Sequence, residues 1–166
     1  MSSGVEWAVH CCVVLSQATA PVPAAQLATL HGVSSSYLAK VLQALSRAGI
    51  ARSIQGAVGG YALTADPSTI SVLDVVLAVD GTEPAFRCTE IRQRGPLAAP
   101  PPACQRPCAV ARAMAAAEAA WRSALAEVSI AALAADVEAD TDGAAFPRLR
   151  AWLQGAPAAP PARHAR

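Results

Sequence analysis

Apolar residues recur at helical spacing through the first fifty residues of the chain. Residues 5–18 carry apolar side chains on two adjoining faces, which predicts a well-buried first helix. A short second helix is expected over residues 24–30, and Gly32, just after it, breaks the helix. The hydroxyls of residues 34–36 are suited to cap a third helix, and Gly49 stops it. The buried stripe of this third helix consists of Leu38, Val41, Leu42 and Leu45.

Two short strands are predicted next, at residues 50–55 and 61–64, and the glycine-rich segment between them indicates a hairpin. Helix, short helix, helix and hairpin are the order of a winged helix-turn-helix, whose third helix enters the DNA major groove. A small helical domain with a surface hairpin is the alternative. Gln43 is suited to read a base edge, while the other polar residues position the protein on DNA. The candidate DNA contacts are Ser36, Tyr37, Lys40, Gln43, Arg47, Arg52 and Gln55.

The second half of the chain predicts further helices around a long loop. Residues 70–79 form an apolar helix that ends at Asp80 and Gly81, and the loop runs from residue 82 to residue 107. A long alanine-rich helix begins at Cys108. Its apolar stripe suits a partner helix, although packing within one chain would produce the same stripe. Ser129 is suited to cap a last short helix over residues 130–137. The stripe consists of Val110, Met114, Ala117, Trp121, Leu125 and Val128.

These segments predict a mainly α fold with a small β-hairpin wing. We expect a winged helix-turn-helix domain over residues 1–81, a functional loop over 82–107, and a dimerisation helix with a short following helix over 108–138. A C-terminal segment covers residues 139–166, and its alanine- and proline-rich tail from Gly155 is expected to be disordered. The stripe of the long helix is longer than the core available to cover it, which favours a homodimer.

Composition narrows the possible functions. The chain is 54% hydrophobic and only 4% aromatic, and much of the apolar content is alanine, which favours helices. Residues 1–65 carry three basic residues and one acidic residue, so a single copy would bind DNA weakly. No apolar run reaches the length of a membrane span, and the first residues lack the basic region of a signal peptide, so we expect a cytoplasmic protein. Without a phosphate loop, a nucleophile motif or paired carboxylates, an enzyme is not expected.

The five cysteines fall into two groups. Cys11 and Cys12 lie on apolar faces of the first helix and are expected in the core. Cys88, Cys104 and Cys108 lie in a proline-rich, polar stretch, where a thiol is hard to bury. In a reducing cytoplasm such cysteines are more often metal ligands or reactive thiols than parts of a disulfide framework.

Glu6 and His10 add two further candidate ligands. They are four residues apart, so both side chains leave the same face of the first helix. Thiolate, imidazole and carboxylate are side chains that bind iron or zinc. Taken singly, Glu6 is also a common N-terminal helix charge and His10 a common surface histidine. Together with the loop cysteines they predict a regulator whose DNA binding is controlled by a metal centre.

Several motifs resemble the bacterial IscR/NsrR family of iron–sulfur transcription regulators. They are SYLAKVLQAL at residues 36–45, AGI at 48–50, GGY at 59–61 and ISVLDVV at 70–76, followed by DG at 80–81. The likeness extends to about residue 137, and the motifs of the third helix and the hairpin are highly specific. The resemblance implies a winged-helix regulator that carries an iron–sulfur cluster.

Two more motifs refine this resemblance: GVEWAVHCC at residues 4–12 and CTEIRQRGP at 88–96 are similar to redox sensors of the RsrR type. The usual family loop has three closely spaced cysteines. Here fifteen residues separate Cys88 from Cys104 and three separate Cys104 from Cys108, which departs from the three-cysteine, four-iron pattern. The resemblance implies instead a 2Fe–2S cluster held by Glu, His and two Cys, with ligands from both subunits.

On this interpretation Glu6 and His10 meet at one iron, and two thiolates from the partner's loop hold the other, which parallels Rieske centres. Cys108 ranks first among the thiolates because it begins a helix, where the N-terminal dipole favours the anion. Cys104, a turn away, ranks second. Cys88 stays open as the alternative second thiolate.

Trp7, next to Glu6, is the candidate switch residue, whose ring changes position with the environment of the cluster. The function predicted from the sequence is a redox-responsive transcription regulator that binds a pseudo-palindromic DNA operator as a homodimer. Three alternatives stay open: the same fold acting as a thiol/disulfide switch, a zinc-dependent regulator, or a small electron-transfer protein. His31 is expected to be structural or to contact phosphate.

Overall fold

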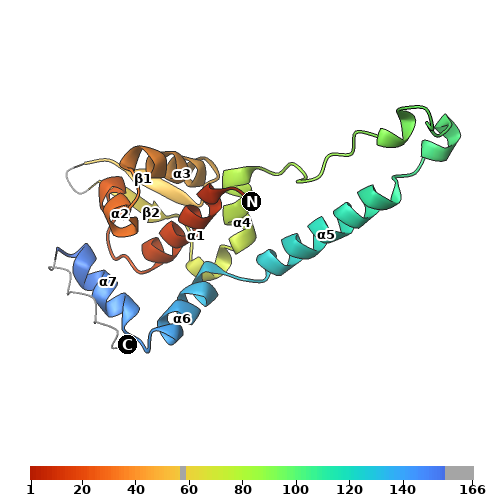
Figure 1. Ribbon diagram of the computed structural model, residues 1–166. Coiled ribbons are helices and arrows are strands. Elements are labelled where there is room, and N and C mark those ends of the chain that lie inside the picture. Colours follow the sequence, from red (N-terminus) through yellow and green to blue (C-terminus); the bar gives the residue numbers. More distant parts are fainter. Residues whose placement is uncertain (57–58, 156–166) are drawn as a thin grey trace, which may run out of the picture.

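The computed structural model describes residues 1–56 and 59–155, and the middle of the hairpin turn and nearly all of the predicted disordered tail lie outside these ranges. A body of helices and one hairpin carries a long projection (Figure 1). In chain order the elements are α1 (Ser3–Ser16), α2 (Ala24–His31), α3 (Ser35–Arg47), β1 (Ala51–Ile54), β2 (Gly60–Leu63), η1 (Pro67–Thr69), α4 (Val72–Asp80), η2 (Ile91–Gln93), η3 (Pro101–Cys104), α5 (Ala109–Ala126), α6 (Ile130–Asp140) and α7 (Ala145–Leu153). The mainly α fold with a small hairpin wing is thus confirmed.

The core lies where α1, α2, α3 and α4 meet. α1 begins and ends two residues earlier than predicted, and Cys11 and Cys12 on it are fully buried, as expected. The whole predicted stripe of α3 is buried against them. Ser34 caps α3, because its hydroxyl accepts a hydrogen bond of 3.3 Å from the amide of Tyr37.

The wing is fixed to the connection between α1 and α2. β1 and β2 pair antiparallel, with Ala51 opposite Leu63 and Ile54 opposite Gly60. The amide of Val22 donates to the carbonyl of Tyr61 at 2.9 Å, and the return bond is 2.8 Å. A Cβ at Gly60 would lie 2.7 Å from the backbone nitrogen of Pro23, so only glycine permits this close approach.

α4 and α6 pack against α1 and complete the body. Ser71 and Asp74 form a capping box at the start of α4. Ser129 caps α6, as predicted, by accepting a hydrogen bond from the amide of Ala132. The amide of Ile130 donates to the carbonyl of Ile70 at 2.9 Å, and Ile130 itself is fully buried. The junction of α5 and α6 is therefore anchored to the body.

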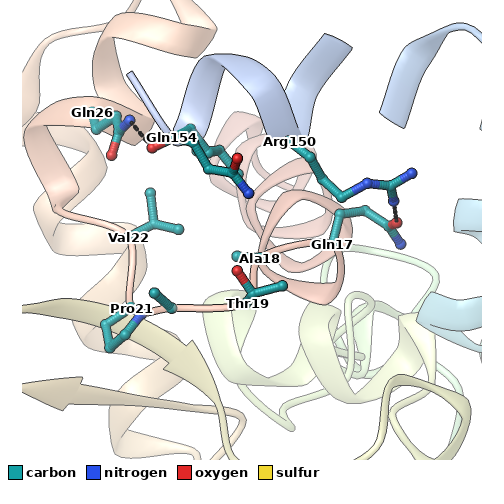
Figure 2. A pocket seen from close by; sticks show the side chains of 10 residues that line it. Gln17, Ala18, Thr19, Pro21, Val22, Gln26, Arg150 and Gln154 are labelled. Carbon is teal, nitrogen blue, oxygen red and sulfur yellow. Dashed lines mark hydrogen bonds between the residues drawn. The ribbon is translucent and has the colours of Figure 1, made fainter. Parts of the chain in front are cut away.

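α7 was not expected from the sequence. It begins where the carboxylate of Glu138 accepts a hydrogen bond of 2.9 Å from the amide of Phe146, whose ring is buried. Arg150 donates to the side-chain oxygen of Gln17 at 3.0 Å (Figure 2). Nε2 of Gln26 on α2 donates to the carbonyl of Leu153 at 3.2 Å, so α7 lies against the end of α1 and against α2 (Figure 2). The pocket between them is half open and has a volume of about 60 Å³, enough for ordered water.

The projection, which we call the arm, comprises residues 82–126: a loop and then α5. At its base Arg122 donates to the carbonyl of Thr82 at 3.1 Å, and the amide of Ala85 donates to Glu118 at 3.0 Å. None of the residues of α5, all of which the structure describes, is buried. Within the described ranges no helix has the length and apolarity needed to cross a membrane.

Candidate DNA-binding face and metal ligands

The helix-turn-helix presents most of the candidate DNA contacts to solvent. α2 ends at Gly32 in the left-handed conformation (φ 65°), and α3 then starts at its cap. β1 packs beside α3, so the wing and the third helix are neighbours. Ser36, Lys40, Gln43, Arg47, Arg52 and Gln55 are all exposed.

Tyr37 differs from the other predicted DNA contacts. Its ring is half-buried against the core, and its Oη lies 3.3 Å from Oγ of Ser3. Tyr37 therefore joins the start of α3 to the start of α1. Tyr37 was predicted as a DNA contact, and its ring also covers the apolar surface between these two helices.

α1 presents Glu6 and His10 to solvent, one helical turn apart. Trp7 between them is half-buried, and its ring centroid lies 6.0 Å from that of His31. The ring of His10 lies 5.9 Å from the same imidazole. Nε2 of His31 is buried and has no hydrogen-bond partner among the described residues. Burial lowers the pKa of His31, and the neighbouring His10 lowers it further. His31, the last residue of α2, thus lies beside the face of α1 that carries His10 and Trp7.

The cysteines divide as the sequence indicated. Burial raises the pKa of both Cys11 and Cys12 to about 12. Cys104 ends η3, and Cys108 caps α5, where its Sγ accepts a hydrogen bond of 3.3 Å from the amide of Ala111. That hydrogen bond is the main cause of a lowered pKa for Cys108, and it acts against partial desolvation.

Cys88 is exposed, whereas Cys104 and Cys108 are both half-buried in the loop. The guanidinium of Arg92 is near enough to Cys104 and Cys108 for each thiolate to stabilise its charge. The charge of this one guanidinium thus influences both cysteines.

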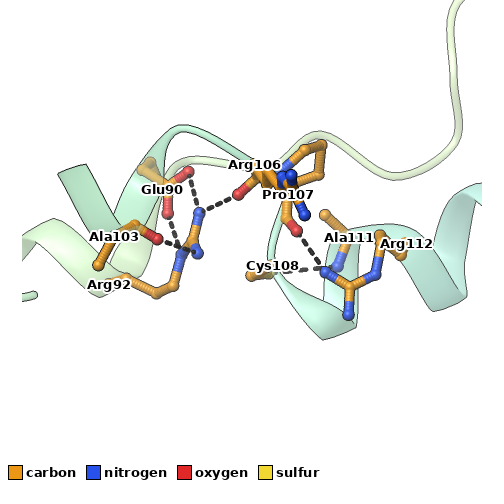
Figure 3. Close-up of polar contacts among 8 residues, drawn as sticks. All are labelled: Glu90, Arg92, Ala103, Arg106, Pro107, Cys108, Ala111 and Arg112. Atoms are coloured by element: carbon orange, nitrogen blue, oxygen red, sulfur yellow. Dashed lines mark hydrogen bonds and ion pairs between the residues drawn. The ribbon is translucent and has the colours of Figure 1, made fainter. Parts of the chain in front are cut away.

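Arg92 and Glu90 organise this loop, and sequence reasoning missed both (Figure 3). Nε and Nη2 of Arg92 donate to the two oxygens of Glu90 at 2.6 and 2.9 Å. The same guanidinium donates to the carbonyl oxygens of Ala103 and Arg106. The pair lies within the motif at residues 88–96, and nothing in their spacing indicates contacts eleven and fourteen residues further along the chain.

The candidate ligands form two separate groups in one chain. Glu6 and His10 stand on α1 in the body, whereas η3 and the start of α5, which carry Cys104 and Cys108, lie at the far end of the arm (Figure 1). In the described part of one chain, no three histidine, cysteine or acidic side chains come together as a metal site. The donor types nevertheless fit an iron–sulfur centre: two accessible thiols, one with a lowered pKa, an imidazole and a carboxylate.

Comparison with known proteins agrees with this architecture. Residues 1–136 match the family model Rrf2, described as an iron-dependent transcriptional regulator. The HTH-type transcriptional regulator IscR of Klebsiella pneumoniae is 41% identical over 76 residues, which are 46% of this chain and 47% of that protein. IscR of Vibrio vulnificus is also 41% identical over 76 residues, 46% of this chain and 45% of its own length. The chain therefore spans about half the length of the curated relatives it matches.

Solved structures share the fold. IscR of T. potens has a TM-score of 0.64 at 21% identity and covers 84% of this chain and 89% of its own. CymR, the global cysteine regulator of B. subtilis, has a TM-score of 0.60 at 22% identity and covers 81% of this chain and 95% of its own. The relatives with curated names are transcriptional regulators, in agreement with the expectation that the chain is not an enzyme. Because the family model matches most of its length, the chain belongs to the Rrf2 family of transcriptional regulators.

Proposed function

We propose that this chain binds operator DNA as a homodimer and that a 2Fe–2S cluster, held between the two chains, controls the binding. The observation that carries the proposal is the separation of the ligands. Glu6 and His10 face solvent on the body, while Cys104 and Cys108 lie at the end of the arm. Each chain thus holds the complete set of donors but in two places. A second copy would bring the thiols of one chain to α1 of the other.

The arm supports pairing of two chains. Val110 and Met114 are 61% and 41% exposed on α5, although both belong to its apolar stripe. Exposed apolar side chains in a row along one helix favour packing against another helix. We infer that this surface meets a second copy and that the two arms hold the dimer together.

DNA binding would use α3 and the wing of each chain. Gln43 on α3 is suited to hydrogen-bond a base edge, and the exposed Lys40, Arg47 and Arg52 are suited to bind phosphates. Three cations per chain bind DNA weakly, so two recognition helices acting together are needed. A dimer of this kind fits a pseudo-palindromic operator with half-sites about one helical turn apart.

Glu6 and His10 would hold one iron, and Cys108 with Cys104 the other, with Cys88 as the alternative second thiolate. When bound, the cluster supplies reversible one-electron chemistry, so the charge beside Glu6 and His10 changes by one unit. Glu6 contributes a negative charge at that position, and His10 a neutral nitrogen donor. The hydrogen bond from Ala111 favours the thiolate form of Cys108 that a metal requires.

Besides the shared core, two contacts lead from the Glu6 and His10 side of α1 and from its start to the helix-turn-helix. Trp7 packs against His31 at the end of α2, and Ser3 contacts Tyr37 at the start of α3. A movement of Trp7 in response to charge at Glu6 would therefore reach the turn between α2 and α3. A difference of ~1–3 kcal/mol between two arrangements of these helices would change DNA affinity ~5–150-fold.

Mixed dimers test the proposal. One variant carries Glu6→Ala and His10→Ala, and the other carries Cys104→Ala and Cys108→Ala. Each alone should lack the visible absorption of the wild-type cluster after anaerobic reconstitution. Mixed in equal amounts and allowed to exchange chains, they should regain one site per heterodimer, because each chain supplies what the other lacks. Absorption, iron and sulfide content, and binding to genomic operator fragments are the measurements.

Matched outcomes separate the alternatives. Mixed dimers that stay colourless although both variants are folded and paired would contradict a cluster shared between two chains. A colourless wild-type protein with redox-dependent crosslinks would indicate the thiol/disulfide switch, and one containing zinc would indicate the zinc regulator. A coloured protein that binds operator and scrambled DNA equally would contradict specific regulation.

A further inference from the structure

The loop that carries the thiols is organised around one guanidinium. Arg92 donates hydrogen bonds of 2.6 and 2.9 Å to Glu90, 3.3 Å to the carbonyl of Ala103 and 2.9 Å to that of Arg106 (Figure 3). All three of its nitrogens take part. The side chain is only 26% exposed, in a region where most neighbours face solvent.

These acceptors lie on both sides of Cys104 and just before Cys108. Ala103 directly precedes Cys104, and Arg106 lies two residues before Cys108. The rigid guanidinium of Arg92 is therefore hydrogen-bonded to the backbone on both sides of Cys104, and the second of these bonds lies two residues before Cys108. The carbonyl of Arg92 in turn accepts a hydrogen bond of 2.7 Å from the amide of Ala99, which closes the intervening segment. None of residues 82–107, all of which the structure describes, has a buried side chain. These hydrogen bonds are therefore the main interactions that order the loop.

Glu90 holds Arg92 in place through an unusual backbone conformation. It lies in the left-handed region (φ 51°, ψ 51°), which costs a residue other than glycine about 1 kcal/mol. This conformation turns the carboxylate back toward Arg92 two residues later, and the two groups meet through parallel hydrogen bonds. Such paired geometry needs the planar fork of arginine, and a lysine ammonium cannot reproduce it.

We infer that Arg92, held by Glu90, is a positioning residue that fixes the backbone around Cys104 and Cys108 before metal arrives. The functional consequence of the inference rests on the proposed function: thiols that are already positioned would capture a cluster faster. Its structural part concerns the metal-free protein alone. The two parts can therefore fail separately.

Amide hydrogen exchange of the metal-free, full-length protein tests the structural part. Arg92→Ala should speed exchange across residues 88–108 by about tenfold or more, as expected when several charge-assisted hydrogen bonds are lost, and leave α3 unchanged. Arg87→Ala is the matched control, because Arg87 forms one exposed ion pair with Glu83 in the same loop. It should change exchange less than about twofold. Exchange in Arg92→Ala within twofold of wild type would overturn the inference.

Arg92→Lys separates position from charge. It keeps the cation but loses the fork, so loop exchange should stay close to that of Arg92→Ala. In reconstituted protein the reduction potential should fall in Arg92→Ala, because a positive charge near the thiolates favours the added electron, and should recover in Arg92→Lys. Cluster assembly should be slower in both variants. A shifted potential with unchanged exchange and assembly would show a purely electrostatic role and would also overturn the inference. Wild-type protein that takes up no cluster would instead count against the proposed function.

Discussion

Cys11 and Cys12 are fully buried, while Cys88, Cys104 and Cys108 stay accessible in the arm. Accessibility and pKa both control how fast a thiol reacts, since the thiolate is the nucleophile. The same side chain therefore packs in the core on α1 and is open to chemical reaction in the arm.

Alkylation should separate the two groups. In metal-free protein near neutral pH, iodoacetamide should modify Cys108 at least about a hundredfold faster than Cys11 or Cys12, because burial raises the pKa of those two and the Ala111 amide lowers that of Cys108. Mass spectrometry of peptides over time measures the rates. In denaturant all five cysteines should react at similar rates. Rapid labelling of Cys11 in the folded protein would contradict the core described for α1.

At the scale of elements, the close contact between wing and body rests on Gly60. Gly60→Ala should lower the free energy of unfolding by ~1–3 kcal/mol, because the added Cβ meets the backbone at Val22 and Pro23 and must displace the bridge between Val22 and Tyr61. Urea denaturation measures the change. Ser53→Ala, on the exposed side of β1 opposite Tyr61, is the control and should change the free energy by less than about 0.5 kcal/mol. Equal stabilities for the two variants would contradict this role of Gly60.

Periodicity was sufficient to predict the elements of the body because each has a strong local signal. Ser34 caps α3 as its hydroxyl suggested, and the leucines of α3 are buried. α7 escaped prediction because it is short and is held by contacts to distant residues such as Gln17. Its apolar Phe146, Leu149 and Leu153 do follow helical spacing and were the available signal.

The loop shows where sequence reasoning ends. The cysteines could be recognised by type, but Glu90 and Arg92 act through a left-handed backbone and carbonyl oxygens far along the chain. Neither property has a sequence pattern. The orientation of Tyr37 was equally hidden, because helical spacing places it at the edge between the buried and exposed faces of α3.

For the whole molecule, the arm is the surface on which pairing can be tested. Met114→Glu should weaken the dimer by about tenfold or more, because it would bury an unpaired charge in the interface. Sedimentation velocity over a dilution series measures the dissociation constant. Ala119→Glu adds the same charge on the opposite side of α5 and should leave pairing unchanged. Equal effects of both variants, or a wild-type protein that stays monomeric, would contradict pairing through the stripe.

The bare surface of α5 carries a further consequence for the behaviour of this regulator. α5 fully buries none of its residues within its own chain and contacts the body only near its C-terminal end, so in the proposed dimer much of its packing would come from the second copy and its order would follow mass action. On dilution, α5 and the loop it supports would lose order together, and the second recognition helix would leave at the same step. The number of molecules in the cell would then set the threshold at which the sensor works, independently of its signal.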